Sequence, residues 1–358
     1  MSSAETAIVL PSNEGFGPEA VGAIGLLVHR LVRAGAEGVV LGSPVRGKPF
    51  ADVPFRPVKP GWGLTGAARY MRGLTAAIGE IGPRLVEVHN RPEIALGLAG
   101  RGRQVSLILN NDPQGMRGAG TAKQRGRMLQ RLALVMTSSE WLRARLLDGV
   151  KAPARDPVVL PNCIDVPPRP TGPRKNLILF AGRVVRDKGA DSFVEACART
   201  LPSLPGWRAE MIGADRFRPD SPDTEFLRAL RPRAAAAGVA MHGHRPNDAV
   251  LEAMQRAAIV VVPSRWEEPF GLVALEAMAC GAALVCSPRG GLREVAGQTA
   301  LFADPDQPAD LASAIMRLAT DVGLRATLAA AARLRSEGFG APEAAARLLT
   351  LRARILGA

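Results

Sequence analysis

Two glutamates separated by seven residues stand where a buried-looking strand leads into a helix. Glu268 lies in a turn punctuated by Pro269 and Gly271, and Glu276 lies about one turn inside the helix that follows. The start of such a helix offers free backbone N–H groups and the positive end of the helix dipole, and together these suit a phosphate group. The pattern therefore predicts a site for a phosphorylated ligand at this turn.

A basic segment follows another predicted strand, NLILFAG at residues 176–182. Arg183 and Lys188 follow it in a turn that closes with Gly189. An arginine supplies a planar fork for two phosphate oxygens, and a lysine supplies a mobile point charge. Taken alone, such residues are more often solvated surface charges. Together with Glu268 and Glu276, they predict binding of a diphosphate.

These segments resemble the signatures of glycosyltransferase family 4, whose members are retaining enzymes with a GT-B fold. The stretch EPFGLVALEAMACG at residues 268–281 looks like the EX7E signature, and SPRGGLREV follows it at 287–295. AGRVVRDKG at 181–189 resembles the GR…KG loop of the family. PNCID at 161–165 resembles its PNG[VI]D segment, with Cys163 in place of the usual glycine. We expect a structural role for Cys163, with a backbone that either departs from the family turn or stays in an ordinary region of φ and ψ.

The resemblance implies transfer of a sugar, with retention at the anomeric carbon, from a nucleotide-sugar donor. In such enzymes Glu268 contacts donor sugar hydroxyls and acts in catalysis, while Glu276 contacts the nucleotide ribose. Arg183 and Lys188 clasp the diphosphate and neutralise the charge that grows on it. The expected donor contacts also include the backbone amides of Gly271, Leu272 and Val273. No cofactor or metal is implied, and the leaving phosphate can take the acceptor proton.

The N-terminal half carries further candidates at predicted strand ends. Gly15 and Gly17 lie in NEGFGPE after the first strand and are expected to let the backbone approach the donor, as the first glycine-rich loop of the family does. The pattern is not a dinucleotide-binding fingerprint. His89 ends another strand, in VHNRPE, and matches the family's loop whose histidine lies near the transferred sugar. The lesser candidates beside it are Asn90, Arg91 and Glu93.

Alternating apolar runs and amphipathic segments position these residues. Five such runs precede a proline-rich stretch at 167–173, and five follow it, which predicts two doubly wound α/β halves on parallel sheets. We therefore expect an acceptor-side domain at 1–167 and a nucleotide-sugar domain at 168–358, with the site in the cleft that they face. The boundary places the terminal helix, 342–356, with the second domain, although its composition allows packing on either. A first helix is expected at 20–34.

The chain of 358 residues carries 46 basic and 33 acidic residues, a formal net charge of +13. Only six basic residues are lysines, so part of this charge fits the amino-acid usage of a GC-rich genome. The excess also favours an anionic partner. The N-terminal half holds a basic run that predicts a contact with an anionic membrane or a lipid-diphosphate acceptor, formed by Arg117, Lys123, Arg125, Arg127, Arg131, Arg143 and Arg145.

Other features limit the location and the chemistry. The N-terminus has no basic segment followed by an apolar one, no stretch reaches the length of a membrane span, and four cysteines show no metal or disulfide spacing. We expect a cytoplasmic protein that can contact the inner face of the membrane. Asp304 and Asp306 resemble a DxD metal motif, but a loop or cap role is favoured. His242 and His244 are expected to be structural, with His244 conceivably near the nucleotide base.

Several alternatives remain open from the sequence. One is a nucleotide-sugar epimerase or a phosphorylase on the same fold, and another is a structural or coat-associated protein that kept the fold without turnover. A basic nucleic-acid binder is a third, although aromatic residues that would stack on bases make up only 4% of the chain. The HNRPE context resembles bacterial cell-envelope and polysaccharide enzymes, so the expected acceptor is a surface glycan. Donor nucleotide, sugar and linkage are not specified.

Overall fold

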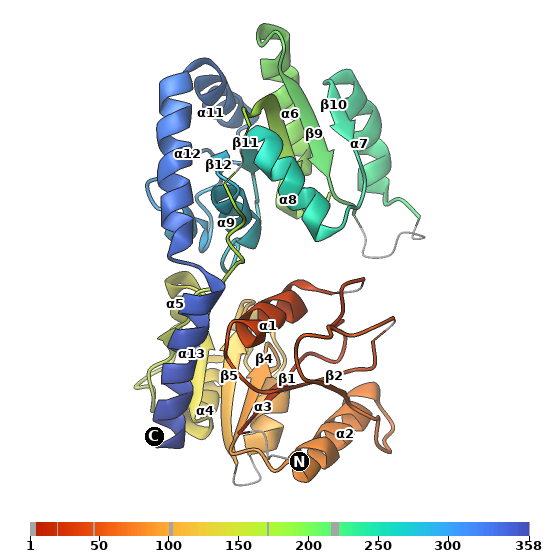
Figure 1. Cartoon of the computed structure of the whole chain (residues 1–358), viewed down its shortest axis with the longest axis vertical. Coiled ribbons are helices and arrows are strands. Elements are labelled where there is room, and N and C mark those ends of the chain that lie inside the picture. The colour runs from red at the N-terminus through yellow and green to blue at the C-terminus, as the bar shows by residue number, and fades with distance from the viewer. Residues whose placement is uncertain are drawn as a thin grey trace. The chain divides into compact units, whose positions relative to one another are not determined.

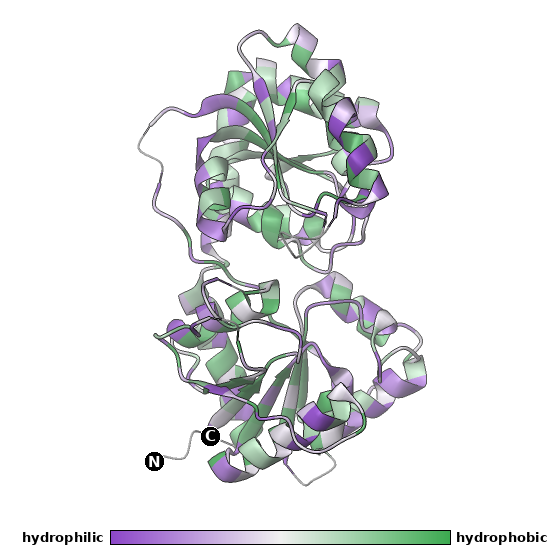
Figure 2. Cartoon of the chain, turned by 90° about the vertical axis from the view of Figure 1, so that its right-hand side faces the viewer, coloured by the Kyte–Doolittle hydropathy of each residue, from purple (hydrophilic) through white to green (hydrophobic). Residues whose placement is uncertain are grey.

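A computed structural model describes residues 5–19, 21–45, 47–99, 103–169, 172–215 and 222–357 of the protein. They form two compact units (Figure 1): Met1–Asp165 with Phe339–Ala358 is unit 1, and Val166–Gly338 is unit 2. The strands at the centre of each unit are apolar, while polar residues gather on the outer faces of the helices (Figure 2). Two predictions fall partly outside the described residues, namely Pro170 and Thr171 of the proline-rich stretch and Ala20 of the first helix.

Unit 1 is built on a parallel sheet with the order β3-β2-β1-β4-β5-β6-β7. Its central strands β1 and β4 are buried along their whole length because helices cover both faces of a parallel sheet, and most of their residues are apolar. The strands are β1 (Thr6–Val9), β2 (Val39–Gly42), β3 (Phe55–Pro57), β4 (Leu85–His89), β5 (Gln104–Leu109), β6 (Leu134–Thr137) and β7 (Val158–Val159).

Three helices of unit 1, α2, α4 and α5, begin at polar caps that the sequence supplies. Thr121 and Gln124 form a capping box at the start of α4, and the side chains of Thr65 and Ser139 accept backbone N–H groups at the starts of α2 and α5. The helices are α1 (Ala23–Arg33), α2 (Gly66–Ile81), α3 (Pro92–Ala99), α4 (Ala122–Arg131), α5 (Glu140–Leu147) and α13 (Ala341–Leu356), with a 3-10 turn, η1, at Pro113–Gly115.

Unit 2 repeats the architecture with a parallel sheet of order β10-β9-β8-β11-β12-β13. Its strands are β8 (Lys175–Ala181), β9 (Arg208–Ile212), β10 (Val239–Met241), β11 (Ala257–Val262), β12 (Ala283–Cys286) and β13 (Ala300–Phe302). Its helices are α6 (Ala190–Thr200), α7 (Glu225–Ala236), α8 (Asn247–Arg256), α9 (Leu272–Ala279), α10 (Leu292–Ala296), α11 (Pro308–Thr320) and α12 (Val322–Glu337), with 3-10 turns η2 (Arg186–Lys188) and η3 (Leu201–Ser203).

The strand order reverses direction once in each sheet. In unit 1 the reversal lies between β1 and β4, and in unit 2 between β8 and β11. Successive loops leave opposite faces at such a point, so a crevice opens at the carboxyl ends of the two strands, where α/β proteins bind ligands. The predicted α/β class with two doubly wound parallel sheets is confirmed. No helix in the described ranges is both long and apolar enough to cross a membrane.

The C-terminal helix corrects the expected boundary. Residues from Phe339 onward belong to unit 1, although the boundary at 167 placed them with the second domain. The apolar face of α13, with Ala341, Ala345 and Leu348, packs in one core cluster with Leu27 and Leu31 of α1. A backbone bridge also joins Ile164 and Gly340. Periodicity gives this helix one apolar face but does not say which domain receives it.

Cys163 takes part in the same cluster. It is fully buried, and its carbonyl oxygen accepts a hydrogen bond from the Arg30 guanidinium at 3.3 Å. Its φ is not positive, so the residue at the usual glycine position has an ordinary backbone conformation. Burial raises the pKa of the Cys163 thiol to about 12, which keeps it protonated near neutral pH.

A buried ion pair fastens α13 to the sheet. Arg352 on α13 donates to both carboxylate oxygens of Glu87 on β4, at 3.0 and 2.8 Å, and to the carbonyl oxygen of Glu37. Burial by itself raises the pKa of the Glu87 carboxyl, but the charge of Arg352 and hydrogen bonds from His89 and Arg352 outweigh it and lower that pKa to about 2. Glu87 is therefore ionised wherever the protein is folded near neutral pH.

Replacing Arg352 with methionine is expected to lower the free energy of unfolding by about 3 to 5 kcal/mol, because Glu87 then keeps a buried charge without its cation. Arg354, exposed two residues further along the same helix, offers the matched control. Urea unfolding of Arg352→Met and Arg354→Met measures both. Equal, small losses in the two variants would contradict a structural role for the buried pair.

The same pair predicts a pH dependence. The folded pKa of Glu87 is about 2 and lies below that of an unfolded glutamate, about 4.3, so its contribution to stability is complete above the unfolded value and is lost as the pH falls towards 2. The difference in unfolding free energy between the native chain and Glu87→Gln should therefore be largest at neutral pH and shrink between pH 4.5 and 3. A difference that stays constant over this range would exclude Glu87 as its source.

Candidate active site

The loops after β8 and β11 meet at the strand-order reversal of unit 2. Lys188 ends η2 in the first loop, and Glu268 lies in the second, 80 positions further along the chain. The Nζ of Lys188 lies 2.5 Å from Oε1 of Glu268, and their side chains are 24% and 13% exposed. Two residues that were predicted separately to bind the donor are therefore in direct contact, and part of each side chain still reaches solvent.

Backbone contacts hold the two loops together. The carbonyl oxygen of Asp187 accepts the N–H groups of Arg265 and Trp266, at 2.8 and 2.9 Å. Gly189 has a φ of +69°, and a Cβ there would lie 1.9 Å from the carbonyl oxygen of Pro263. Only glycine permits so close an approach of the first loop to the end of β11. The glycine that ends the GR…KG segment thus serves the packing of the site.

The segment 287–295 packs against the turn that carries Glu268. Gly290 has a φ of +61°, a Cβ there would lie 2.2 Å from the carbonyl oxygen of Glu268, and the N–H of Gly291 donates to that oxygen at 2.7 Å. Gly271 has a φ of +105° and precedes α9 without a side-chain cap. The first backbone N–H groups of α9 thus have no capping side chain to accept them.

The remaining predicted donor residues of unit 2 lie at the same edge. Glu276 is buried inside α9 with 9% exposure, in a helix that is otherwise apolar. Arg183 is exposed directly after β8, and the next residue, Val184, is fully buried and donates its N–H to the carbonyl oxygen of Ala214 after β9. Leu272 and Val273 form the first turn of α9.

Arg265 is a part of the site that the sequence reasoning missed. Its guanidinium donates to the carboxylate of Asp191 at 2.6 and 3.1 Å, to Ser192 Oγ at 2.6 Å, to the Arg186 carbonyl oxygen at 2.9 Å and to Asp306 at 2.8 Å. It therefore ties the Glu268 loop to η2 and to the start of α6. The only sequence signal was an arginine beside a motif, and that signal does not distinguish a surface charge from a clamp.

The Asp304–Asp306 segment completes this clamp. Asp306 accepts from Arg265 and from Arg289, and Asp304 accepts the backbone N–H of Asp306 at 3.0 Å. A hydrogen bond from Arg289, more than compensating for desolvation, lowers the pKa of Asp306. Two guanidinium groups beside this carboxylate make its surroundings cationic, which fits the expected loop role better than a divalent metal site.

The glycine-rich loop of unit 1 follows β1 and is anchored by protein contacts. Phe16 is fully buried and stacks on Phe55, with ring centroids 5.1 Å apart. A Cβ on Gly17 would lie 2.3 Å from the carbonyl oxygen of Lys48, so this glycine permits two loops of the protein to approach each other. Gly15 lies on the partly exposed side of the same loop, and its carbonyl oxygen lies against Gly25 of α1.

His89 ends β4 and is 1% exposed. Its Nε2 lies 3.3 Å from Oε1 of Glu87, which is the carboxylate that Arg352 holds. With the ionised Glu87 as acceptor, Nε2 of His89 is the hydrogen-bond donor, and Nδ1 is buried without a partner among the described residues. The histidine is thus oriented by the C-terminal helix through Glu87.

Asn90 joins the neighbouring strand ends around His89. It has a φ of +54°, and its Oδ1 accepts the N–H groups of Asn110 and Asn111 at 3.1 and 3.2 Å. Arg91 donates to Asn13 in the loop after β1 at 2.6 Å. The side-chain amide of Asn110 is buried and unpaired within the described part of the chain. Sequence reasoning named Asn90 and Arg91 as lesser candidates and missed Asn110.

The sequence matches known families over both units. Residues 167–335 match the model of the glycosyl transferases group 1 family, and residues 22–163 match that of the glycosyl transferase 4-like domain. The chain belongs to this glycosyltransferase family. The resemblance drawn from residues 268–281 and 181–189 is therefore confirmed.

Individual proteins agree with this family membership. The chain is 38% identical over 158 residues to a D-inositol 3-phosphate glycosyltransferase of Acidothermus cellulolyticus, a match that spans 42% of this chain and 35% of that protein. The fold resembles that of sucrose-phosphate synthase from Thermosynechococcus elongatus, with a TM-score of 0.80, 19% identity and 99% of each chain covered. It also resembles Anabaena HepE in complex with UDP-glucose, with a TM-score of 0.76, 17% identity and 97% and 99% coverage. The predicted GT-B fold is thus confirmed.

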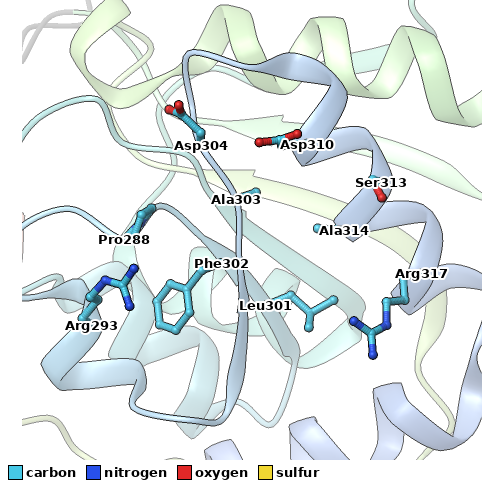
Figure 3. A pocket seen from close by; sticks show the side chains of 10 residues that line it. All are labelled: Pro288, Arg293, Leu301, Phe302, Ala303, Asp304, Asp310, Ser313, Ala314 and Arg317. Carbon is cyan, nitrogen blue, oxygen red and sulfur yellow. The ribbon is translucent and has the colours of Figure 1, made fainter.

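One pocket of unit 2 lies beside the segments 287–295 and Asp304–Asp306, and Asp304 is among the residues that line it (Figure 3). It follows the edge strand β13 between α10 and α11 and is lined by Leu301, Phe302 and Arg317, among others. Arg293 lies over the Phe302 ring at 5.1 Å. Because β11 and β12 separate β13 from β8 in the sheet, this pocket is not the crevice at the strand-order reversal.

Replacing Arg265 with glutamine is expected to loosen the Glu268 loop, since the loop then loses its charged bonds to Asp191 and Asp306. Hydrogen bonds to charged groups contribute about 1.5 to 3 kcal/mol, so amide exchange at residues 264–270 should speed up by at least roughly tenfold while the core strands stay protected. Arg199→Gln is the control, because Arg199 makes one exposed pair with Glu195. Unchanged exchange in Arg265→Gln would show that the clamp does not hold the loop.

Proposed function

We propose that the protein is a retaining glycosyltransferase that moves a sugar from a nucleotide-sugar donor to a cell-envelope or polysaccharide acceptor. The observation that carries the proposal is the contact between Lys188 and Glu268 at the strand-order reversal of unit 2. It brings a cation suited to a diphosphate next to a carboxylate suited to sugar hydroxyls. Family membership supports the reaction class, and the UDP-glucose complex of HepE supports a nucleotide-sugar donor.

The proposed chemistry follows from where charge develops. As the bond between the anomeric carbon and the diphosphate breaks, negative charge grows on the leaving oxygens, and Arg183 and Lys188 stabilise it. The backbone N–H groups at Gly271, Leu272 and Val273 add the positive end of the α9 dipole. Glu268 accepts hydrogen bonds from the sugar hydroxyls, and buried Glu276 binds the ribose. The leaving phosphate accepts the proton of the acceptor hydroxyl.

Lys188 changes partners in this scheme. Without donor it is neutralised by Glu268. A bound diphosphate, with its greater charge, competes for the ammonium group and releases the Glu268 carboxylate towards the sugar. Clamping of the Glu268 loop by Arg265 keeps the carboxylate in reach while this exchange happens. Because the loop is already ordered, little binding energy is spent on arranging it.

Unit 1 supplies the acceptor side in this proposal. The buried, unpartnered Nδ1 of His89 bonds to a sugar hydroxyl, and Gly15 and Gly17 keep the loop after β1 close to the nucleotide-sugar donor. The cell-envelope or polysaccharide acceptor is supported by the resemblance of the HNRPE segment and by nothing more specific. The D-inositol 3-phosphate named for the Acidothermus relative is the acceptor to test beside it.

Turnover is expected to need no divalent metal, since Arg183, Lys188 and the α9 N-terminus carry positive charge where a metal otherwise neutralises a diphosphate. The rate of donor hydrolysis in about 5 to 10 mM chelator should match the rate with added Mg²⁺ within twofold. A rate that collapses in chelator and returns with one metal would contradict this mechanism.

The donor is found by thermal shift across UDP-, GDP- and ADP-sugars, followed by slow donor hydrolysis. One donor should stabilise the native chain, and Lys188→Ala should abolish that shift and lower kcat/KM by about 100- to 1000-fold, as for loss of one charge-stabilising contact. Lys175→Ala is the control, because Lys175 is exposed at the opposite end of β8. Glu268→Gln should keep nucleotide binding and lose turnover.

Failure would take a clear form. If no nucleotide or sugar nucleotide stabilises a folded sample, the enzyme assignment is wrong and a non-catalytic scaffold on the same fold is the better interpretation. If donor binds but Lys188→Ala and Lys175→Ala behave alike, the family assignment stands and the proposed diphosphate site does not.

A further inference from the structure

Three of the seven residues in the basic run that predicted an anionic partner are bound to other groups of the protein. Arg125 is 3% exposed, and its guanidinium donates to the carbonyl oxygens of Leu146, Ala119, Gly120 and Asp148. Arg145 pairs with Asp112 at 2.8 Å, and Arg143 donates to the Pro157 carbonyl oxygen at 3.0 Å. These three arginines serve as internal braces, so the net charge of +13 overstates the cation density of that face.

A different segment of unit 1 combines basic charge with exposed apolar side chains. Residues 54–79, from just before β3 to the last turn of α2, hold four basic residues and no acidic residue, and Glu80 follows directly. The loop between these elements carries Trp62 and Leu64, which are 78% and 95% exposed. These are the two most exposed large apolar side chains among the described residues. We call residues 59–72 the Trp62 platform.

The platform is held in place by backbone contacts, so its exposure is built into the fold. The N–H of Gly61 donates to the Arg69 carbonyl oxygen at 2.9 Å, and Arg72 donates to the Trp62 carbonyl oxygen at 2.7 Å. The Arg72 guanidinium also lies over the Trp62 ring, 4.8 Å from its centroid. A Cβ on Gly73 would lie 2.1 Å from the Lys59 carbonyl oxygen, so this glycine lets the loop lie directly on α2.

The opposite face of α2 fixes the orientation of the platform. Tyr70, Leu74 and Ile78 are buried against the sheet, and the Tyr70 hydroxyl donates to the Leu10 carbonyl oxygen. The remaining face carries Arg69 and Arg72 beside small residues at Ala67 and Ala68. Figure 1 shows α2 on the outside of unit 1. An apolar loop tip and a basic helix turn thus share one surface.

Two cationic side chains of the platform are free to bind an anionic partner. Lys59 and Arg69 are exposed and make no side-chain hydrogen bond or ion pair within the described chain, whereas Arg56 at the margin pairs with Glu80. Tryptophan favours the boundary between headgroups and acyl chains, leucine favours the acyl region, and lysine or arginine contributes about 1 kcal/mol each near an anionic leaflet. The apolar loop tip and the basic residues beside it therefore suit the acyl and headgroup regions of such a leaflet.

We propose that the Trp62 platform docks on the surface of an anionic phospholipid bilayer. Trp62 and Leu64 enter the interface, and Lys59, Arg69 and Arg72 contact the headgroups. Two copies pressed together through this platform would bring like charges face to face, which disfavours a dimer there. A single tryptophan, already covered on one side by Arg72, offers little stacking surface for nucleic-acid bases. This binding is separate from the proposed sugar transfer and requires no donor.

The test is sedimentation of the full chain with two kinds of vesicle, one of phosphatidylglycerol and phosphatidylcholine and one of phosphatidylcholine alone. Each is measured at low salt and at about 0.5 M salt, which screens surface charges. Binding is expected with the anionic vesicles and should fall with salt. Trp62→Ser with Leu64→Ser should weaken it by roughly tenfold or more, and Lys59→Gln or Arg69→Gln by roughly fivefold each.

Leu334→Ser in α12 is the matched control, because Leu334 is a single large apolar side chain that is 67% exposed in unit 2. It should leave vesicle binding unchanged. Thermal shift with the donor should be the same in the Trp62→Ser/Leu64→Ser variant and the native chain, so a failure of docking is distinguishable from a failure of donor binding.

Three outcomes would overturn the proposal. They are equal binding to neutral and anionic vesicles, unchanged binding by the platform variant, and a dimer in the absence of lipid that dissociates in the platform variant. The last would assign the surface to a second copy of the chain.

Discussion

In each unit two parallel strands that are far apart in the sequence lie side by side where the strand order reverses. Most candidate site residues lie at or just after the ends of these strands: the loops after β8 and β11 carry Lys188 and Glu268, the loop after β1 carries Gly15, and His89 is the last residue of β4. The contact between Lys188 and Glu268 exists because β8 pairs with β11. In unit 2, Gly189 and Gly290, which have positive φ, let the backbone segments around Lys188 and Glu268 approach each other more closely than any other residue allows.

A buried charge pair connects the end of the chain to the candidate catalytic histidine. Arg352 holds Glu87, and Glu87 accepts from His89, so the C-terminal helix orients a side chain on β4. A buried carboxylate is costly unless it is paired, and here both of its oxygens have partners. This pair explains why α13 packs on unit 1 although the chain reaches it only after completing unit 2.

Arginine has two uses in this protein, and only burial separates them. Arg125 and Arg352 are buried and satisfy carbonyl or carboxylate oxygens, whereas Arg69 and Arg183 are exposed at surfaces or strand ends. Arg265 is intermediate between the buried and the exposed arginines, since it lies in the candidate site and its guanidinium bonds to Asp191. Net charge is therefore a weak guide to partners in an arginine-rich chain, and the distribution of exposed cations is a better one.

The sequence alone determined the fold class, the family and the identity of the donor-side candidates, because strand periodicity and the motifs at 181–189 and 268–281 are local patterns. It could not say which of the arginines in 117–145 are braces, that Arg265 clamps the Glu268 loop, or that the backbone N–H of Asn110 bonds to the side chain of Asn90. Those facts depend on which carbonyl and carboxylate oxygens come within reach after folding. The placement of α13 is of the same kind: an amphipathic helix carries one apolar face, and only the tertiary structure decided that this face covers α1 and delivers Arg352 to Glu87.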